Sequence, residues 1–385
     1  MTVHNRTGSK VLRVGKVILA IILSALCLVL IFNFLTLLLF GSSFGGHGAH
    51  AVAGGYKLLD RFDNYIVNMT SSALDGIIPV EKVFMLSDSD QVAPEPDPDL
   101  FGITRNPEDL QSAVSTARRR LNGEDLLFHT DVKIFEESDI RYYLDETIFA
   151  VSWKQVINNV VYTFSEVKIQ HPSQFRRFLA DGKYGSDKQY LTSQMASSVN
   201  AVVASAGDFY KYRQFGLVVY NGQVERFEGN FLDNCFIDDL GDLVFAKAGE
   251  LNSRQELEQF AKDRNVRFSL SFGPVLIEDG YPVVNPNYPL GEITDGHPRS
   301  ALCQQGPLHY VLVTANAEGI YGAYPTLPDF ANALAGVGIQ KAYALDGGQT
   351  ATIVMNDEVI NKVSYGAQRY ISDIIYFATA IPEHK

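Results

Sequence analysis

The chain carries no charged residue from Val17 to Phe40, and this run restricts its fold more than any other feature. A single helix of that length spans the hydrocarbon core of a bilayer. Basic residues precede the run and no acidic residue occurs before Asp60, so the positive-inside rule predicts a cytoplasmic N-terminus. The sequence therefore predicts a cytoplasmic tail over residues 1–16, a transmembrane anchor over residues 17–40, and an extracytoplasmic remainder.

A cleaved signal peptide is the alternative interpretation of this N-terminal region. Ala51-Val52-Ala53 offers a small-residue cleavage site. The apolar region of a signal peptide is normally only about 7 to 15 residues long, and this run is longer. The length favours an uncleaved anchor, which would attach the chain to the membrane through this helix and place everything after Phe40 outside.

Residues 41–125 are predicted to form a stalk and a linker. Tyr56 to Asn68 carries apolar residues at helical spacing, which is typical of a short amphipathic helix. The stretch SDSDQVAPEPDPD, from Ser87 to Asp99, is rich in proline and acid and reads as an extended linker. A helix is expected from Pro107 to Leu121, ending at Gly123. The main domain is predicted to begin at residue 126 and to continue to residue 385.

Composition limits the classes of partner and the redox chemistry. The formal net charge of -12 argues against a nucleic-acid partner, because phosphate backbones are bound by clustered Lys and Arg. The basic run Arg118-Arg119-Arg120 is typical of a solvated helix face. Cys235 and Cys303 both follow the anchor, and they are compatible with a disulfide or with two buried free thiols.

The main domain shows several hairpins and few strand-helix-strand units. Hairpins are predicted at Phe215–Phe227, around Asn221-Gly222, and at Cys235–Ala246. Further strands and helices are expected from apolar periodicity and capping residues. The expected strands are residues 160–169, 266–272, 309–315, 343–345 and 352–355, and the expected helices are residues 172–182, 253–263 and 327–336. This pattern indicates an α+β fold, a single mixed-sheet domain with flanking helices.

Polar residues and glycines interrupt the chain where several predicted strands end. In YALDGGQTATIVMND the strand ending at Leu345 stops for Asp346, Gly347 and Gly348 before a second apolar run begins. Glycines let a backbone approach a ligand closely, and an acid beside such a bend can act in a cleft. A tight turn with an Asp bonded to its own backbone is the alternative interpretation. Similar interruptions occur at SAGDFYKYR, SFGPVLIEDG, DGHPRSALCQ and YGAQRYISD.

Taken together, these segments resemble the phosphodiester glycosidase family over roughly Val160 to Phe377. The resemblance implies an α/β-type catalytic domain that hydrolyses the bond between the anomeric carbon of a sugar and a phosphodiester. It also implies an extracytoplasmic glycan or exopolysaccharide-type substrate, since bacterial members of the family are commonly labelled exopolysaccharide biosynthesis proteins.

Individual residues of this chain match the motifs of the family. Asp208 matches the aspartate of the Asn-Gly-Asp motif, Arg299 matches the motif arginine, and Asp346 with its two glycines matches the Asp-Gly-Gly segment. Arg369, Ser372 and Asp373 match the late Arg-x-x-Ser-Asp/Asn segment. Three positions depart from the family pattern: Ala206 stands where Asn is usual, Gln349 where a third Gly is frequent, and Cys303 where Gly is common.

The residue types suit the chemistry that the resemblance implies. A phosphodiester is already a good leaving group, so binding the phosphate matters more than general-acid help. Guanidinium groups bind phosphate through two parallel hydrogen bonds. We therefore expect the following roles. The catalytic candidates are Asp208, Asp346 and His297, and the substrate-binding candidates are Arg299, Arg369, Gly347, Gly348, Gln349, Thr350, Phe209, Tyr210, Ser372 and Asp373.

Several alternatives stay open at this point. His297 beside a proline could donate a proton or serve the structure only. No metal site is predicted, although paired aspartates could hold a divalent cation. A non-catalytic glycan-binding or assembly protein of the cell envelope would keep the fold and use Phe209, Tyr210 and Tyr212 as a platform for sugars. A metal-dependent phosphoesterase lacks support, since no His-Asp cluster occurs at ligand spacing.

Overall fold

The computed structural model describes residues 84–87, 91–121, 126–136, 138–289 and 292–382. The predicted cytoplasmic tail, the anchor and the stalk helix lie outside these residues. Among the residues described, no helix is both long enough and apolar enough to cross a bilayer. Val83–Lys385 form one compact unit.

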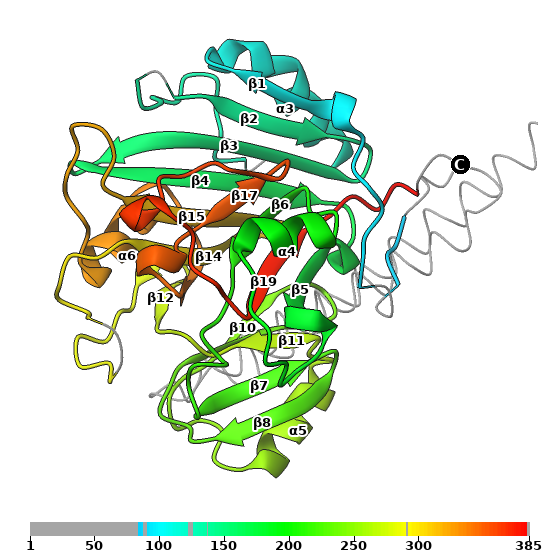
Figure 1. The fold of residues 1–385 in the computed structure, drawn as a ribbon, viewed down its shortest axis with the longest axis vertical. Coiled ribbons are helices and arrows are strands. Elements are labelled where there is room, and N and C mark those ends of the chain that lie inside the picture. The colour runs from blue at the N-terminus through cyan, green and yellow to red at the C-terminus, as the bar shows by residue number, and fades with distance from the viewer. Residues whose placement is uncertain (1–83, 88–90, 122–125, 137, 290–291, 383–385) are drawn as a thin grey trace, which may run out of the picture. The chain divides into compact units, whose positions relative to one another are not determined.

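A nine-stranded antiparallel sheet forms the largest layer of this unit, in the order β1-β2-β3-β4-β15-β14-β16-β12-β13 (Figure 1). One face packs against α3 (Gln111–Arg120) and α6 (Leu327–Gly336), and buries Trp153, Tyr162 and Phe330 between them. The strands are β1 Phe101–Thr104, β2 Ile140–Leu144, β3 Ile148–Ile157, β4 Val160–Ile169, β12 Val275–Glu278, β13 Tyr281–Pro282, β14 Arg299–Gly306, β15 His309–Asn316 and β16 Lys341–Leu345.

A five-stranded antiparallel sheet covers part of the other face, in the order β18-β17-β6-β19-β5. Apolar side chains from both sheets share one core, including Leu312, Tyr343, Ile353 and Phe377. The helix α4 (Thr192–Ser198) packs with the outer face of this second sheet through Met195. The strands are β5 Phe175–Leu179, β6 Val203–Ala206, β17 Ile353–Met355, β18 Glu358–Val359 and β19 Asp373–Phe377.

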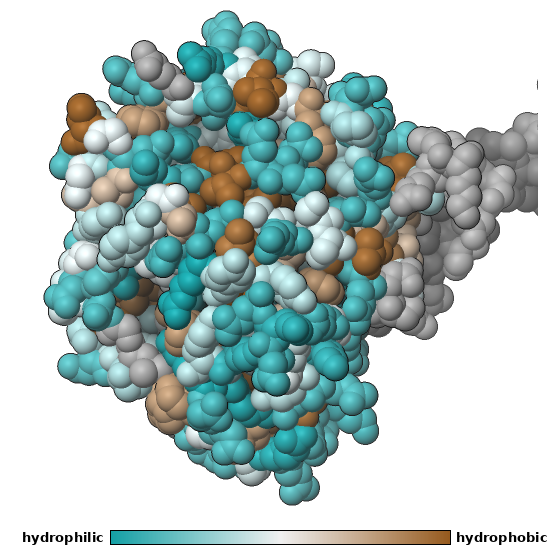
Figure 2. Space-filling model, viewed as in Figure 1, coloured by the Kyte–Doolittle hydropathy of each residue, from teal (hydrophilic) through white to brown (hydrophobic). Residues whose placement is uncertain are grey.

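A smaller subdomain of two short sheets and one helix lies at the lower end of the view in Figure 1. Its three-stranded sheet has the order β10-β9-β11, and β7 pairs with β8. The helix α5 (Arg254–Asp263) buries Leu257 against this layer. The strands are β7 Gly216–Tyr220, β8 Gln223–Glu228, β9 Asn234–Ile237, β10 Leu243–Ala246 and β11 Phe268–Leu270. On the face that Figure 2 shows, apolar side chains form small separate patches among polar ones.

Most elements expected in the main domain are present, which confirms a sheet-rich α+β fold with few helices. The strand at Val160–Ile169 has the expected bounds. Both predicted hairpins form, and Asn221 and Gly222 have the positive φ angles (49° and 75°) that a two-residue hairpin turn needs. Ser253 caps α5 by accepting a hydrogen bond from the Glu256 N–H, as its spacing predicts.

The helix predicted at residues 172–182 is wrong. Pro172–Gln174 form a single 3-10 turn, and the chain then continues as the strand β5. Phe175 and Leu179 are buried, and β5 pairs along its length with β19. The extended conformation is stabilised by burial between neighbouring elements, which outweighs the weak local preference for a helix.

The predicted domain boundary at residue 126 is also wrong. β1 pairs with β2 in the large sheet, and Leu110 and Val114 lie in the core on its α6 face. Ala93, inside the expected linker, is buried and donates its N–H to the Val199 carbonyl. The helix expected at residues 107–121 is present, as a 3-10 turn (Pro107–Leu110) followed by α3. Residues 91–121 are therefore part of the domain and not of a stalk.

The two cysteines after the anchor are free thiols, which decides between the alternatives left by the sequence. Cys235 lies on β9 and Cys303 on β14, and both are buried. Burial raises the pKa of both thiols above the ordinary range. Each cysteine thus packs as a small apolar residue.

Replacing Leu110 tests whether residues 91–121 belong to the domain. Leu110→Ala removes a fully buried side chain, so the free energy of unfolding should fall by about 2–5 kcal/mol. Leu100→Ala, in the same segment but 38% exposed, should change it by less than about 0.5 kcal/mol. Urea unfolding followed by circular dichroism measures both variants. If Leu110→Ala were as mild as Leu100→Ala, the segment would be a stalk after all.

Candidate active site

The Asp346-Gly347-Gly348 turn is the place where the chain passes from one sheet to the other. β16 ends at Leu345 in the nine-stranded sheet, and β17 begins at Ile353 in the five-stranded sheet. A Cβ atom on Gly347 would lie 2.5 Å from the Pro298 carbonyl oxygen, so no larger residue fits there. The interruption in the sequence is therefore a crossover between sheets, and it leaves the Asp346 carboxyl at the end of the strand.

The Asp346 carboxyl is half-buried, and its environment changes its acidity. Burial raises the pKa of Asp346 to about 6, and the negative charge of Asp208 also raises it. The Thr350 hydroxyl, Arg369 and Arg213 act in the opposite direction. Asp346 is thus a stronger base than an ordinary aspartate and still ionised in most molecules at neutral pH.

A pocket of about 170 Å³ opens beside Asp346. Two of its walls are the turn after β16 and the segment that leads into β14. The residues that line it are Phe272, Gly273, Glu292, His297, Pro298, Arg299, Ser300, Leu327, Ala344, Leu345, Asp346, Gly347 and Gly348.

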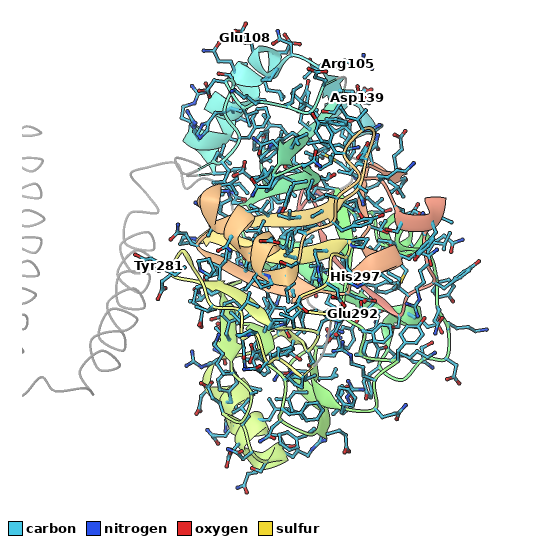
Figure 3. All side chains as sticks on the ribbon, turned by 90° about the vertical axis from the view of Figure 1, so that its left-hand side faces the viewer. Arg105, Glu108, Asp139, Tyr281, Glu292 and His297 are labelled. Atoms are coloured by element: carbon cyan, nitrogen blue, oxygen red, sulfur yellow. The ribbon has the colours of Figure 1, made fainter. Side chains whose placement is uncertain are left out.

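His297 and Arg299 reach this pocket but are held by neighbouring groups. The His297 Nε2 lies within hydrogen-bond distance of the Glu292 carboxylate, and Figure 3 shows the two residues close together. The Arg299 Nε donates to the Pro325 carbonyl (3.3 Å), and Nη2 donates to the carbonyls of Glu292 (2.6 Å) and Asp295 (2.7 Å). Burial lowers the pKa of Arg299. Most of its donors therefore fix loops of the chain.

Arg213 and Arg369 present their guanidinium groups to aromatic rings. Arg213 lies 4.4 Å from the centroid of Phe272, a residue of the pocket wall, and donates to the Phe272 carbonyl (3.2 Å). Arg369 is exposed and lies 5.5 Å from the Phe209 centroid and 5.0 Å from that of Tyr212. The positive charge of each arginine lowers the pKa of Asp346. Within the described part of the chain, Arg369 contacts rings and forms no ion pair, so its charge is available to an anion.

Asp208 and Asp373 belong to a buried ion cluster with Arg177. The Arg177 Nε donates to Asp373 Oδ2 (2.8 Å), and its Nη2 lies 2.8 Å from the same oxygen and 3.8 Å from Asp208 Oδ2. All three side chains are buried. Burial raises the pKa of Asp373, Arg177 lowers it, and Asp208 raises it again.

The Asp208 carboxylate is occupied by backbone donors. Its Oδ1 accepts the Phe209 N–H and its Oδ2 accepts the Ser271 N–H, both at 2.6 Å. The Asp208 N–H in turn donates to Asp373 Oδ2 (3.0 Å). Asp208 therefore joins the turn after β6 to the segment after β11, and its oxygens do not face solvent.

The remaining predicted binding residues lie in three different surroundings. Phe209 stacks on Tyr212, with ring centroids 4.5 Å apart, at the surface near Arg369. Tyr210 and Ser372 are buried away from the surface. Thr350 donates to the Gly347 carbonyl (2.5 Å), Gln349 donates to the Ala367 carbonyl (2.9 Å), and both bonds hold the turn in place.

The structure thus brings Asp346, Gly347, Gly348, His297, Arg299 and Arg369 to one region, and it places Asp208, Asp373, Tyr210 and Ser372 beneath it. Two arginines of this region were not predicted from the sequence. Arg213 lies in the stretch SAGDFYKYR, where its proximity to aromatic residues was the available signal. Arg177 was hidden by the wrong helix prediction. Among the described residues, no group of three or more His, Cys, Asp or Glu could hold a metal ion.

Comparison with known proteins gives a family match for the C-terminal part of the chain. Residues 199–378 match the family model described as NAGPA: Phosphodiester glycosidase. This range contains Asp346, Arg213, Arg369 and the buried Asp208 and Asp373. The resemblance to the phosphodiester glycosidase family is therefore confirmed for this part of the chain.

Individual relatives are distant. The chain is 25% identical over 112 residues to the SPbeta prophage-derived uncharacterized protein YomE of Bacillus subtilis (strain 168), and the match covers 29% of this chain and 17% of that protein. Similar structures include the catalytic domain of zebrafish N-acetylglucosamine-1-phosphodiester alpha-N-acetylglucosaminidase, auto-inhibited by its pro-peptide (17% identity, 65% of this chain, 85% of that chain, TM-score 0.48). A hypothetical protein from Synechocystis is also similar (13% identity, 64% of each chain, TM-score 0.45).

Removing Arg177 tests the buried cluster. Arg177→Met leaves two carboxyl groups buried together without a cation, and the free energy of unfolding should fall by about 3–5 kcal/mol at pH 8. The loss should be smaller at pH 4. Arg177 lowers the pKa of Asp373, so without it the folded-state pKa of Asp373 lies further above its unfolded value, and the protein loses stability as the pH rises between the two values.

Thermal unfolding at pH 4 and pH 8 measures this difference. Arg105→Met, which removes an exposed arginine paired with Asp139, serves as the control and should change stability little at either pH. An equal loss at both pH values for Arg177→Met would contradict the charge-based account. If Arg177→Met fails to fold at pH 8, Arg177→Lys supplies the comparison at both values.

Proposed function

We propose that this protein hydrolyses a sugar-1-phosphodiester by cleaving the bond between the anomeric carbon and oxygen. The observation that carries the proposal is the half-buried Asp346 carboxyl, with its pKa raised to about 6, lying within the influence of Arg213 and Arg369. A basic carboxylate and two guanidinium groups in one region match the needs of a substrate with an anionic leaving group. The family match supports the same reaction class.

In this proposal Arg213 binds the phosphodiester that leaves. Its guanidinium packs on the ring of Phe272, a residue in the wall of the pocket that contains Asp346. Some of its N–H groups donate to backbone carbonyls, and the others are available to a phosphate. Asp346 takes a proton from the attacking water. The water oxygen bonds to the anomeric carbon, the bond from that carbon to the phosphate oxygen breaks, and the phosphate departs with the electron pair. The proposed sequence inverts the anomeric configuration.

Asp208 takes a positioning role in this proposal, in place of the catalytic role expected from the sequence. Its two oxygens hold the backbone of Phe209 and Ser271 at 2.6 Å, which fixes the segments carrying Arg213 and Phe272. The departure at Ala206 does not alter the pocket, because Ala206 packs on the outer side of the five-stranded sheet with Ile374. The family's Asn is therefore absent from a position that does not face Asp346.

We further propose that the reaction takes place outside the cytoplasmic membrane on a cell-surface or exopolysaccharide-type glycan. The support is the uncharged run at residues 17–40 and the basic residues before it, both read from the sequence. A non-catalytic glycan-binding protein of the cell envelope is the second candidate. The exposed stack of Phe209 on Tyr212 favours it, since sugars bind to aromatic faces.

Hydrolysis in ¹⁸O-labelled water tests the reaction. The expected product carries the label on the sugar and not on the phosphate, and NMR should show the inverted anomer first. Asp346→Asn should lower kcat by a factor on the order of 100 or more while the fold, followed by circular dichroism, is retained. Label in the phosphate would show P–O cleavage and overturn the proposal. Glycan binding without turnover, unchanged by Asp346→Asn, would favour the second candidate.

The pH dependence of kcat/KM tests the role of Asp346 as a base. The rate should rise with pH and level off above a midpoint near 6, because only the ionised carboxylate accepts a proton. Arg213 lowers the pKa of Asp346, so Arg213→Gln should move this midpoint to higher pH in addition to weakening the reaction. Arg105→Gln, an exposed arginine of another loop, should leave the midpoint in place. A midpoint that does not respond to Arg213→Gln would remove Asp346 from the role of base.

A further inference from the structure

Arginines and aromatic rings alternate along the surface beside Asp346. Phe231 contacts Phe215 (ring centroids 5.0 Å apart), and Arg213 lies 6.0 Å from the Phe215 centroid and 5.6 Å from that of Phe209. Phe209 stacks on Tyr212, and Arg369 lies 5.0 Å from the Tyr212 centroid. We call this series the arginine-aromatic band: Phe231, Phe215, Arg213, Phe209, Tyr212 and Arg369.

The band is open to a ligand. Phe231 is 43% exposed and Tyr212 is 37% exposed, and Tyr370, whose carbonyl accepts a bond from the Tyr212 hydroxyl (3.0 Å), is 58% exposed. Aromatic faces bind the apolar faces of sugars, whereas guanidinium groups bind phosphate through paired hydrogen bonds. A band that alternates the two is complementary to a chain that alternates sugars and phosphates.

Two guanidinium groups of the band, those of Arg213 and Arg369, lower the pKa of Asp346 through their positive charge. A single phosphodiester carries one negative charge, and one guanidinium is enough to bind it. Here two guanidinium groups, those of Arg213 and Arg369, act on the same carboxylate. Both lie near the Phe209 ring, Arg213 at 5.6 Å and Arg369 at 5.5 Å from its centroid, and Arg369 also lies 5.0 Å from the Tyr212 centroid. The second guanidinium has no described anionic partner and is suited to a second phosphate.

We propose that the substrate is a repeating sugar-phosphate chain and that the enzyme cuts its internal linkages. This inference rests on the proposed function. The sugar attacked at Asp346 carries two phosphodiesters, the leaving one bound by Arg213 and another, on a different hydroxyl of the chain, bound by Arg369. Water adds to the anomeric carbon, its proton passes to Asp346, and the phosphate at Arg213 leaves with the electron pair, so the chain is divided in two.

The loop that carries Arg369 is fixed to the site before any substrate arrives. The Gln349 side chain, next to the Asp-Gly-Gly turn, donates to the Ala367 carbonyl (2.9 Å), and the Gln368 side chain donates to Ser193 (2.9 Å). The Tyr212 hydroxyl bonds the Tyr370 carbonyl on the other side of Arg369. A guanidinium held in this way loses little conformational freedom on binding phosphate.

Synthetic oligomers of one sugar joined by one, two or three phosphodiesters test the proposal. The value of kcat/KM should rise roughly 10- to 100-fold from one to two phosphodiesters, which is the value of one charge-assisted contact. A third phosphodiester should add much less. Arg369→Gln should abolish most of the ratio between the two-phosphate and one-phosphate substrates, whereas Arg105→Gln should leave that ratio unchanged. Equal kcat/KM for one and two phosphodiesters in the unmodified protein would overturn the inference and leave the proposed function intact.

Binding separates failure of the inference from failure of the proposed function. Calorimetry with the Asp346→Asn variant should show tighter binding of the two-phosphate oligomer than of the one-phosphate oligomer, with the difference lost in the Asp346→Asn, Arg369→Gln double variant. If no oligomer is hydrolysed by the unmodified protein but this difference is present, the hydrolase is refuted and the recognition of two phosphates is supported. If binding does not depend on the second phosphate, the inference is refuted whether or not hydrolysis occurs.

Discussion

The ion pair between Arg177 and Asp373 is the interaction on which the rest of the site depends. It joins β5 to β19 inside the five-stranded sheet, and Asp208 connects it to the turn after β6 and to Ser271. The approach is so close that a Cβ atom on Gly207 would lie 2.4 Å from Asp373 Oδ2. Two carboxylates share one guanidinium, and burial makes any unpaired charge costly. The backbone of residues 207–213 is held as a consequence, and with it the Phe209 and Tyr212 rings and Arg213.

The two aspartates expected to share the chemistry have different environments, and this difference assigns their roles. Asp208 is enclosed, with both oxygens accepting backbone N–H groups. Asp346 is half-buried at a crossover, near arginines but without an ion pair as close as that of Asp373, and its pKa is raised. A group can exchange protons with water only if water reaches it. Of the two, the more accessible carboxylate is therefore the one suited to the proposed role of base, and the charge of the enclosed one raises its pKa.

The sequence predicted the elements whose signals are local. The β7–β8 turn, the caps of α5 and α6 and the strand β4 depend on a few neighbouring residues, and all are present. The strand β5 was missed because PSQFRRFLADG, with a proline at its start, is typical of a helix. Its pairing with β19 and its burial make it a strand instead. The same error concealed Arg177, since its partner lies 196 residues away in the sequence. Arg213 was not predicted as a site residue because its position depends on its contact with Phe272, and no local sequence pattern connects the two residues.

The arginines of the domain divide according to how their donors are used. The guanidinium of Arg177 is paired with carboxylates. That of Arg299 donates to three backbone carbonyls, and these bonds hold the loops before β14 and α6. Arg177 cannot turn to an anion without leaving buried carboxylates unpaired, which costs more than one new hydrogen bond returns, and Arg299 would have to release the carbonyls that hold these loops. Arg213 and Arg369 rest mainly on rings, and a ring face loses little when a guanidinium also binds phosphate through its edge. The aromatic residues therefore orient these two arginines and leave most of their donors available to an anion.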